Sequence, residues 1–311
     1  MFVFFFILFL FSILQEVNAE EILDQHSSLE IVPKDSLLFD KGYYYFGVKI
    51  TLEEGWKTYW KNPGEAGAPL SIDFNDNPEI LENEILFPFP KQFMDYDIET
   101  IGYEKEIIFP IKLKLNENKK KIVSTINLQY LVCKDICIPM STERNLNHSL
   151  KKSSESIKKS NLYNYLEKVP SKNTNYFLIK DFKKISDKKI SFSIDDFNLD
   201  KINVFAFSNL SSLSTKTYKK NNLNIVEVIT EENFNADEII SLAISNGKKI
   251  EEIQIKNSDF KFSEERTIIF FFLLALVGGI ILNFMPCVLP VLSLKMIALL
   301  KVNNQNKFLL F

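Results

Sequence analysis

The first half of the chain is dominated by segments in which apolar and polar residues partly alternate. Three of them are rich in β-branched and aromatic residues and predict β-strands: Tyr43–Leu52, Glu106–Leu115 and Ile122–Val132. The segments between them hold turn-forming residues, such as the Asn-Pro-Gly sequence at residues 62–64. Because many short strands joined by such turns are typical of an antiparallel sandwich, we predict a β-sandwich domain over residues 25–145.

A polar linker, residues 146–170, separates this domain from a second strand-rich region. Helical spacing of apolar residues predicts one short helix over Ile157–Val169, ended by Pro170. Residues 171–262 have the same strand character as the first domain and predict a second, smaller sandwich. Its five predicted strands are Lys189–Ile194, Ile202–Phe207, Leu223–Ile229, Glu238–Ile244 and Ile250–Ile255.

The N-terminal end is continuously apolar rather than alternating. The run at residues 2–14 is too short to cross a bilayer, which takes roughly 20 residues. Small residues follow at Val17 and Ala19, as at a secretory cleavage site, so we predict a signal peptide over residues 1–19. An uncleaved anchor and a buried strand are the alternatives.

The C-terminal apolar run is longer, with 27 residues free of charge from Ile268 to Leu294. It predicts a transmembrane helix over residues 267–301, with residues 302–311 as the cytoplasmic start of the next segment. Lysines follow the run, so the positive-inside rule places residues 20–266 outside, in the periplasm of a Gram-negative cell. The expected fold class is mainly β: two immunoglobulin-like antiparallel β-sandwich domains followed by a transmembrane α-helix in the inner membrane.

The charge of the chain argues against binding to nucleic acid. The formal net charge is −3, and residues 20–266 carry −5 because residues 1–19 contribute −1 and residues 267–311 contribute +3. Nucleic-acid binding calls for a basic face, which a mildly acidic region does not supply. The composition, with 46% hydrophobic residues and three cysteines, also excludes a collagen-like chain, intrinsic disorder and a disulfide-dense mini-protein.

Cys133 and Cys137 are the clearest candidates for chemistry. A disulfide between them would stabilise the fold by only about 2 kcal/mol, against roughly 4.7 kcal/mol for a bridge that closes a loop of about 100 residues. A tight pair is better suited to being made and broken, so we favour a redox-active pair over a structural staple. A third possibility is a Cu(I) site formed by Cys133, Cys137 and Met140, because all three are soft ligands.

Cys287 lies inside the predicted transmembrane segment, between Pro286 and Pro290. These prolines break the helical hydrogen-bond ladder, which a membrane tolerates only where other helices or water satisfy the freed carbonyls. With Asn283 also nearby, the sequence favours a packed, functional site over an inert buried thiol.

Three motifs resemble the DsbD family of membrane thiol:disulfide interchange proteins, most closely its ScsB-like branch linked to copper tolerance. Gly55–Gly64 is similar to the N-terminal periplasmic signature of the family, Tyr130–Pro139 to its redox pair and Gly278–Lys295 to its first transmembrane helix. The resemblance implies a protein-disulfide reductase, a thiol:disulfide oxidoreductase that uses no cofactor.

The resemblance also implies an electron route. Reducing equivalents pass from cytoplasmic thioredoxin through cysteines of the membrane domain, including Cys287, to a C-terminal thioredoxin-like domain and then to Cys133 and Cys137. Cys137 attacks the disulfide of a periplasmic thioredoxin-fold partner, and Cys133 resolves the mixed disulfide. The process served is cytochrome c maturation or copper tolerance. We expect the remainder of the membrane domain and the thioredoxin-like domain to be supplied from outside residues 1–311.

Aromatic residues near the first two motifs are candidates for shaping the site. Trp56 and Trp60 either cover the edge of the sandwich or form a wall of the cysteine site. The family shields its periplasmic cysteines with an aromatic cap loop, and the resemblance makes Phe89 or Phe93 a candidate for that role.

Overall fold

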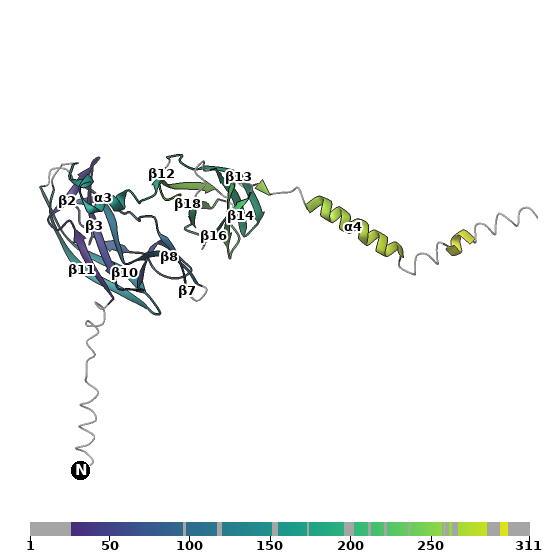
Figure 1. The fold of residues 1–311 in the computed structure, drawn as a ribbon, viewed down its shortest axis with the longest axis horizontal. Helices are drawn as coiled ribbons and strands as arrows, with labels where there is room; N and C mark the ends of the chain where they lie inside the picture. The colour runs from purple at the N-terminus through teal and green to yellow at the C-terminus, as the bar shows by residue number, and fades with distance from the viewer. Residues whose placement is uncertain are drawn as a thin grey trace, which may run out of the picture.

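The computed structural model describes most of the chain between residues 26 and 297. The described ranges are 26–95, 98–116, 120–150, 155–172, 174–195, 202–210, 213–220, 223–235, 237–256, 258, 261–262, 267–284 and 293–297. The predicted signal peptide at residues 1–19, the predicted site at Cys287 with Pro286 and Pro290, and the segment 302–311 lie outside them. Two β-rich domains follow each other in chain order, and a helix comes after the second (Figure 1).

The first domain is a β-sandwich whose strands pair in the order β6-β9-β3-β2-β11-β10-β4-β8-β7, with β1 on β3 and β5 on β10. The predicted strands at Tyr43–Leu52 and Glu106–Leu115 are confirmed as β3 and β9, and β10 extends the third by one residue at each end. The strands are β1 (Ser27–Val32), β2 (Ser36–Asp40), β3 (Tyr43–Leu52), β4 (Lys57–Gly64), β5 (Ser71–Asp73), β6 (Ile80–Ile85), β7 (Lys91–Asp95), β8 (Ile98–Glu104), β9 (Glu106–Leu115), β10 (Lys121–Cys133) and β11 (Cys137–Leu150).

Alternation along β10 places the core inside this sandwich. The side chains of Ile122, Ile126, Leu128, Tyr130 and Val132 are buried, and the residues between them are more exposed. Burying a large apolar side chain stabilises the fold by about 1.5–3 kcal/mol. A shift of the strand by one residue would turn all of these side chains out of the core and lose that stabilisation. These buried side chains therefore fix the register of β10, and this register determines where the end of β10 lies in the candidate site.

The second domain is a smaller sandwich, as predicted. One sheet has the order β12-β19-β18-β15 and the other β16-β17-β14-β13-β20. The prediction lacked the two-residue strands β12 and β20. It also lacked β13 and β16, because their mostly exposed, lysine-rich residues show little apolar alternation. The strands are β12 (Ser171–Lys172), β13 (Leu178–Ser186), β14 (Lys189–Asp195), β15 (Asn203–Phe207), β16 (Leu213–Lys220), β17 (Leu223–Thr230), β18 (Ile239–Ser245), β19 (Ile250–Lys256) and β20 (Lys261–Phe262).

The linker differs from the single helix predicted over Ile157–Val169. Two short helices form instead, α2 (Glu155–Lys158) and α3 (Asn161–Leu166). They are separated at Ser160, which has an extended backbone and donates a side-chain hydrogen bond to the Ile157 carbonyl at 2.7 Å. Such local hydrogen bonds compete with those of a continuous helix, so the prediction of one helix was wrong.

Helix α4 (Thr267–Phe284) follows the second domain and falls within the predicted transmembrane range. Among the residues that the structure describes, no helix is both long and apolar enough to cross a membrane. The transmembrane helix expected over residues 267–301 is therefore not confirmed and stays a prediction.

Candidate functional site

The two cysteines of the first domain meet across the turn of a hairpin. Cys133 ends β10, Cys137 begins β11, and the two are direct partners in the register of these strands. They form a disulfide, with their Cα atoms 4.1 Å apart. Within the turn, the Lys134 amide donates a hydrogen bond to the Ile136 carbonyl at 3.0 Å. The hairpin thus brings together the pair that the sequence singled out.

The two cysteines differ strongly in exposure. Cys133 is 2% exposed, whereas Cys137 is exposed and its neighbour Ile136 is 65% exposed. The rate of attack on a disulfide depends on which sulfur an incoming thiol can reach. The geometry leaves Cys137 facing solvent and keeps Cys133 protected.

A lysine lies beside the buried cysteine. Lys57 of β4 is the direct register partner of Cys133, and Glu104 of β8 is the direct partner of Lys57. The Lys57 ammonium forms an ion pair with Asp95 and donates a hydrogen bond to the Thr100 hydroxyl at 3.4 Å. Burial lowers the pKa of Lys57, because desolvation disfavours its charged form. We did not predict this residue as part of the site, because it reaches Cys133 only through non-local strand pairing.

Phe93, one of the two candidate shielding residues, lies next to this lysine. The Lys57 Nζ atom is 5.3 Å from the centroid of the Phe93 ring, and Phe93 is the register partner of Thr100. The β7–β8 hairpin thereby covers Lys57. The other candidate, Phe89, packs against Phe205 of the second domain, with ring centroids 5.2 Å apart.

The two candidate tryptophans also occupy different places. Trp56, in the loop directly before β4, stacks on His26 with ring centroids 4.0 Å apart and an interplanar angle of 10°. Trp60 is fully buried where the domains meet, with ring centroids 6.0 Å from Phe205 and 5.3 Å from Phe207. Trp56 therefore belongs to the cysteine end of the domain and Trp60 to the interdomain interface.

The loop before β4 also contacts the turn between the cysteines. Gly55 has a φ of +83°, and a Cβ atom built on it would lie 3.0 Å from the Cε atom of Lys134. A larger residue would strain the backbone and displace the Lys134 side chain. Gly55 therefore allows the two turns to approach each other.

The structure does not bring the three candidate Cu(I) ligands to one face. Met140 is 8% exposed and belongs to the core of the first domain. Because side chains alternate along a strand, Met140 and Cys137 of β11 point to opposite faces. In the part of the chain that the structure describes, no group of three His, Cys, Asp or Glu side chains could hold a metal ion. A copper titration of the reduced chain would test this alternative.

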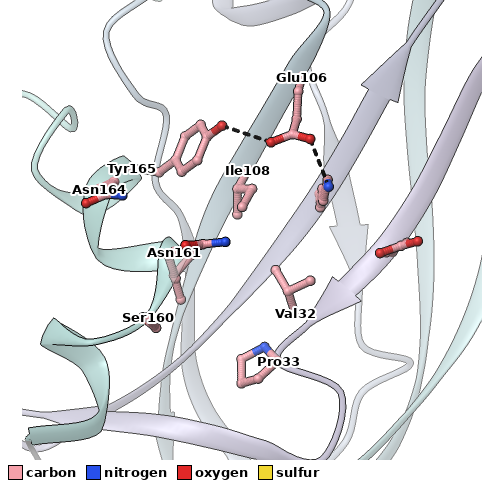
Figure 2. Close-up of a pocket in the computed structure, with 11 residues that line it drawn as sticks. Val32, Pro33, Glu106, Ile108, Ser160, Asn161, Asn164 and Tyr165 are labelled. Carbon is pink, nitrogen blue, oxygen red and sulfur yellow. Dashed lines mark hydrogen bonds and ion pairs between the residues drawn. The ribbon is translucent and has the colours of Figure 1, made fainter.

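A separate cavity of about 460 Å³ lies between the first domain and α3 (Figure 2). Its apolar lining includes Val32, Pro33 and Ile108. The Tyr165 hydroxyl points toward Glu106 and donates a hydrogen bond to its carboxylate at 3.4 Å. None of the described lining residues is a cysteine, so this cavity is not part of the disulfide site.

Comparison with known proteins finds a family model that matches the part of the chain carrying the cysteine hairpin. Residues 30–148 match the family described as thiol:disulfide interchange protein DsbD, N-terminal. No curated protein matched the chain.

Comparison with solved structures supports the fold. The N-terminal periplasmic domain of ScsB from Proteus mirabilis is similar, with a TM-score of 0.62 and 17% sequence identity, covering 75% of this chain and 94% of that chain. Tandem Ig repeats of Dlar align with a TM-score of 0.21 and 7% identity, covering 76% of this chain and 99% of that chain, which is too low to support an argument. The first likeness shows a shared mainly β, immunoglobulin-like sandwich fold.

Proposed function

We propose, from the premise that this chain is a DsbD/ScsB-like family protein, that its first domain exchanges thiols and disulfides through Cys133 and Cys137. One observation carries the proposal: a hairpin turn joins an exposed Cys137 to a Cys133 that is 2% exposed. A tight bridge with one accessible sulfur suits repeated opening and closing, whereas it adds little to the stability of the sandwich.

The reaction that fits this asymmetry is reduction of a partner disulfide. The Cys137 thiolate attacks one sulfur of the partner, and the other partner sulfur leaves as a thiolate. The Cys133 thiolate then attacks the Cys137 sulfur, which releases the reduced partner and restores the disulfide. The exposure of Cys137 supports its role as the attacking group, and the burial of Cys133 supports its role in the internal step.

The setting we propose follows the family. Residues 1–19 direct export, residues 267–301 cross the inner membrane, and residues 20–266 lie in the periplasm. Cys287, between Pro286 and Pro290, belongs to the membrane relay. Cytoplasmic thioredoxin supplies electrons through the remainder of a DsbD-type membrane domain and its thioredoxin-like domain. The periplasmic partners are thioredoxin-fold proteins of cytochrome c maturation or copper tolerance.

Trapping the mixed disulfide tests this proposal. The full chain carrying Cys133→Ser, mixed with an oxidised thioredoxin-fold protein, should accumulate a covalent complex through Cys137, because the resolving thiol is gone. The matched variant Cys137→Ser should form far less of it through this site, because the Cys133 thiol is buried. Equal trapping by both variants, or none by either, would contradict the proposed roles.

A further inference from the structure

Four residues form a row across the sheet at the cysteine end of the first domain. Cys137, Cys133, Lys57 and Glu104 are successive register partners on β11, β10, β4 and β8. In an antiparallel pair, directly opposite side chains share one face, with Cβ atoms about 5 Å apart. The Lys57 side chain therefore begins beside that of Cys133.

The charge of Lys57 is enclosed rather than solvated. Its side chain is 9% exposed, the Phe93 ring lies next to its ammonium, and Asp95 supplies the facing carboxylate. Lysine is almost never buried unless it is paired. Water and salt screen a charge in such surroundings less than they screen a surface lysine.

We propose that Lys57 is a positioning residue of the redox pair, whose ammonium favours the thiolate form of Cys133 once the disulfide is reduced. This inference rests on the proposed function. A nearby cation favours a thiolate, and the thiolate is the form that attacks a disulfide. In the resolving step the Cys133 sulfur bonds to the Cys137 sulfur, and the bond from Cys137 to the partner breaks with its electron pair on the partner sulfur.

The acidic groups around Lys57 have different roles. Glu104, in the same row, pairs with Lys91 at 2.7 Å, and this hydrogen bond lowers the pKa of the Glu104 carboxyl. Asp95 pairs with Lys57 itself. Asp95 is therefore the carboxylate that competes with a Cys133 thiolate for the Lys57 ammonium.

The turn between the cysteines contributes one charge of each sign. Lys134 and Asp135 are both exposed, so water screens their effects on the thiols. Within the described residues, Lys57 is the buried cation whose strand position is directly opposite Cys133.

The pH dependence of the resolving step tests the inference. The reduced full chain is mixed with glutathione disulfide, and decay of the mixed disulfide at Cys137 is followed by acid quench and mass spectrometry. Trypsin cleaves after Lys134, so modification of each cysteine is read on a separate peptide. Lys57→Met, Lys57→Arg and Asp95→Asn are compared with wild type and with Lys114→Met, an exposed lysine paired with Glu82 on the other side of the sandwich.

Lys57→Met should raise the midpoint pH of resolution by about 1. At pH 7 resolution should slow by about threefold, since a roughly tenfold loss of thiolate is partly offset by the greater nucleophilicity of a less acidic thiol. Lys57→Arg should keep the wild-type midpoint, Asp95→Asn should lower it, and Lys114→Met should leave it unchanged.

An unchanged midpoint in Lys57→Met would overturn the inference. If that variant does not fold, Asp95→Asn decides, and an unchanged midpoint there overturns it equally. Absence of both the mixed disulfide and the re-formed Cys133–Cys137 disulfide in the wild-type chain would instead refute the proposed function, so the two failures can be told apart.

Discussion

The Trp60 ring of the first domain packs edge-on against the Phe207 ring of the second, with centroids 5.3 Å apart and an interplanar angle of 85°. The two residues after Trp60 continue this interface. Lys61 pairs with Glu252 at 2.7 Å, and the Asn62 amide donates a hydrogen bond to a second-domain carbonyl at 3.3 Å. The motif Gly55–Gly64 therefore serves the cysteine site at its start and joins the two domains at its end.

Removing the Lys61 ammonium should destabilise the chain. The Glu252 side chain is 7% exposed, so Lys61→Met would leave a buried carboxylate without this cation, at a cost of about 3 kcal/mol in the free energy of unfolding. Lys180→Met, which breaks an exposed pair with Asp195, should cost less than about 1 kcal/mol. Denaturant unfolding compares them, and equal costs would contradict a buried interdomain ion pair.

Phe93→Ala and Phe89→Ala should separate shielding of the site from interdomain packing. Because Phe93 covers Lys57 beside Cys133, its truncation should speed alkylation of the reduced cysteines several-fold. Because Phe89 packs on Phe205, its truncation should reduce stability by about 2 kcal/mol and leave alkylation unchanged. Faster alkylation in Phe89→Ala alone would reverse this assignment of the shielding residue.

The buried phenol of Tyr103 should make stability depend on alkaline pH. Tyr103 donates a hydrogen bond to the Pro88 carbonyl at 2.6 Å, and burial raises its pKa well above the usual 10.0. A raised pKa in the folded state means that the unfolded chain ionises first. The stabilisation is therefore fully present below about pH 10 and is lost above it, at up to about 1.4 kcal/mol per pH unit.

Tyr103→Phe should remove the contribution of this phenol to the loss of stability at alkaline pH. At pH 7 the variant should be about 1 kcal/mol less stable, because a buried hydrogen bond is lost. Between about pH 10 and 11.5 its free energy of unfolding should fall less steeply than that of the wild-type chain. Parallel curves in urea titrations across this range would show that Tyr103 does not carry the effect.

Local pattern was enough to predict part of the fold. The bounds of β3 and β9 follow from runs of β-branched and aromatic residues, most of which are buried. The same reasoning does not predict β13 and β16. Their place in the sheet depends on pairing with neighbouring strands rather than on apolar side chains of their own. The linker helix was predicted as continuous because apolar spacing does not reveal the break at Ser160.

In the candidate site, too, the sequence predicts local contacts but not contacts between distant strands. Cys133 and Cys137 are close in the chain, so their pairing across a turn could be anticipated. The approach of Lys57 to Cys133 could not, because it depends on β4 pairing with β10 across a large sequence separation. Phe89 and Phe93 lie in one short segment, yet the fold sends one to the domain interface and the other to the cysteine end.

The reduction potential of the Cys133–Cys137 pair tests the central claim most directly. It can be measured in the full chain by equilibration with glutathione redox buffers and peptide mapping of each cysteine. A redox-active pair should have a potential more oxidising than about −300 mV, so that it exchanges with partner disulfides. A potential far below about −300 mV would mark a bridge that resists reduction and would contradict the account.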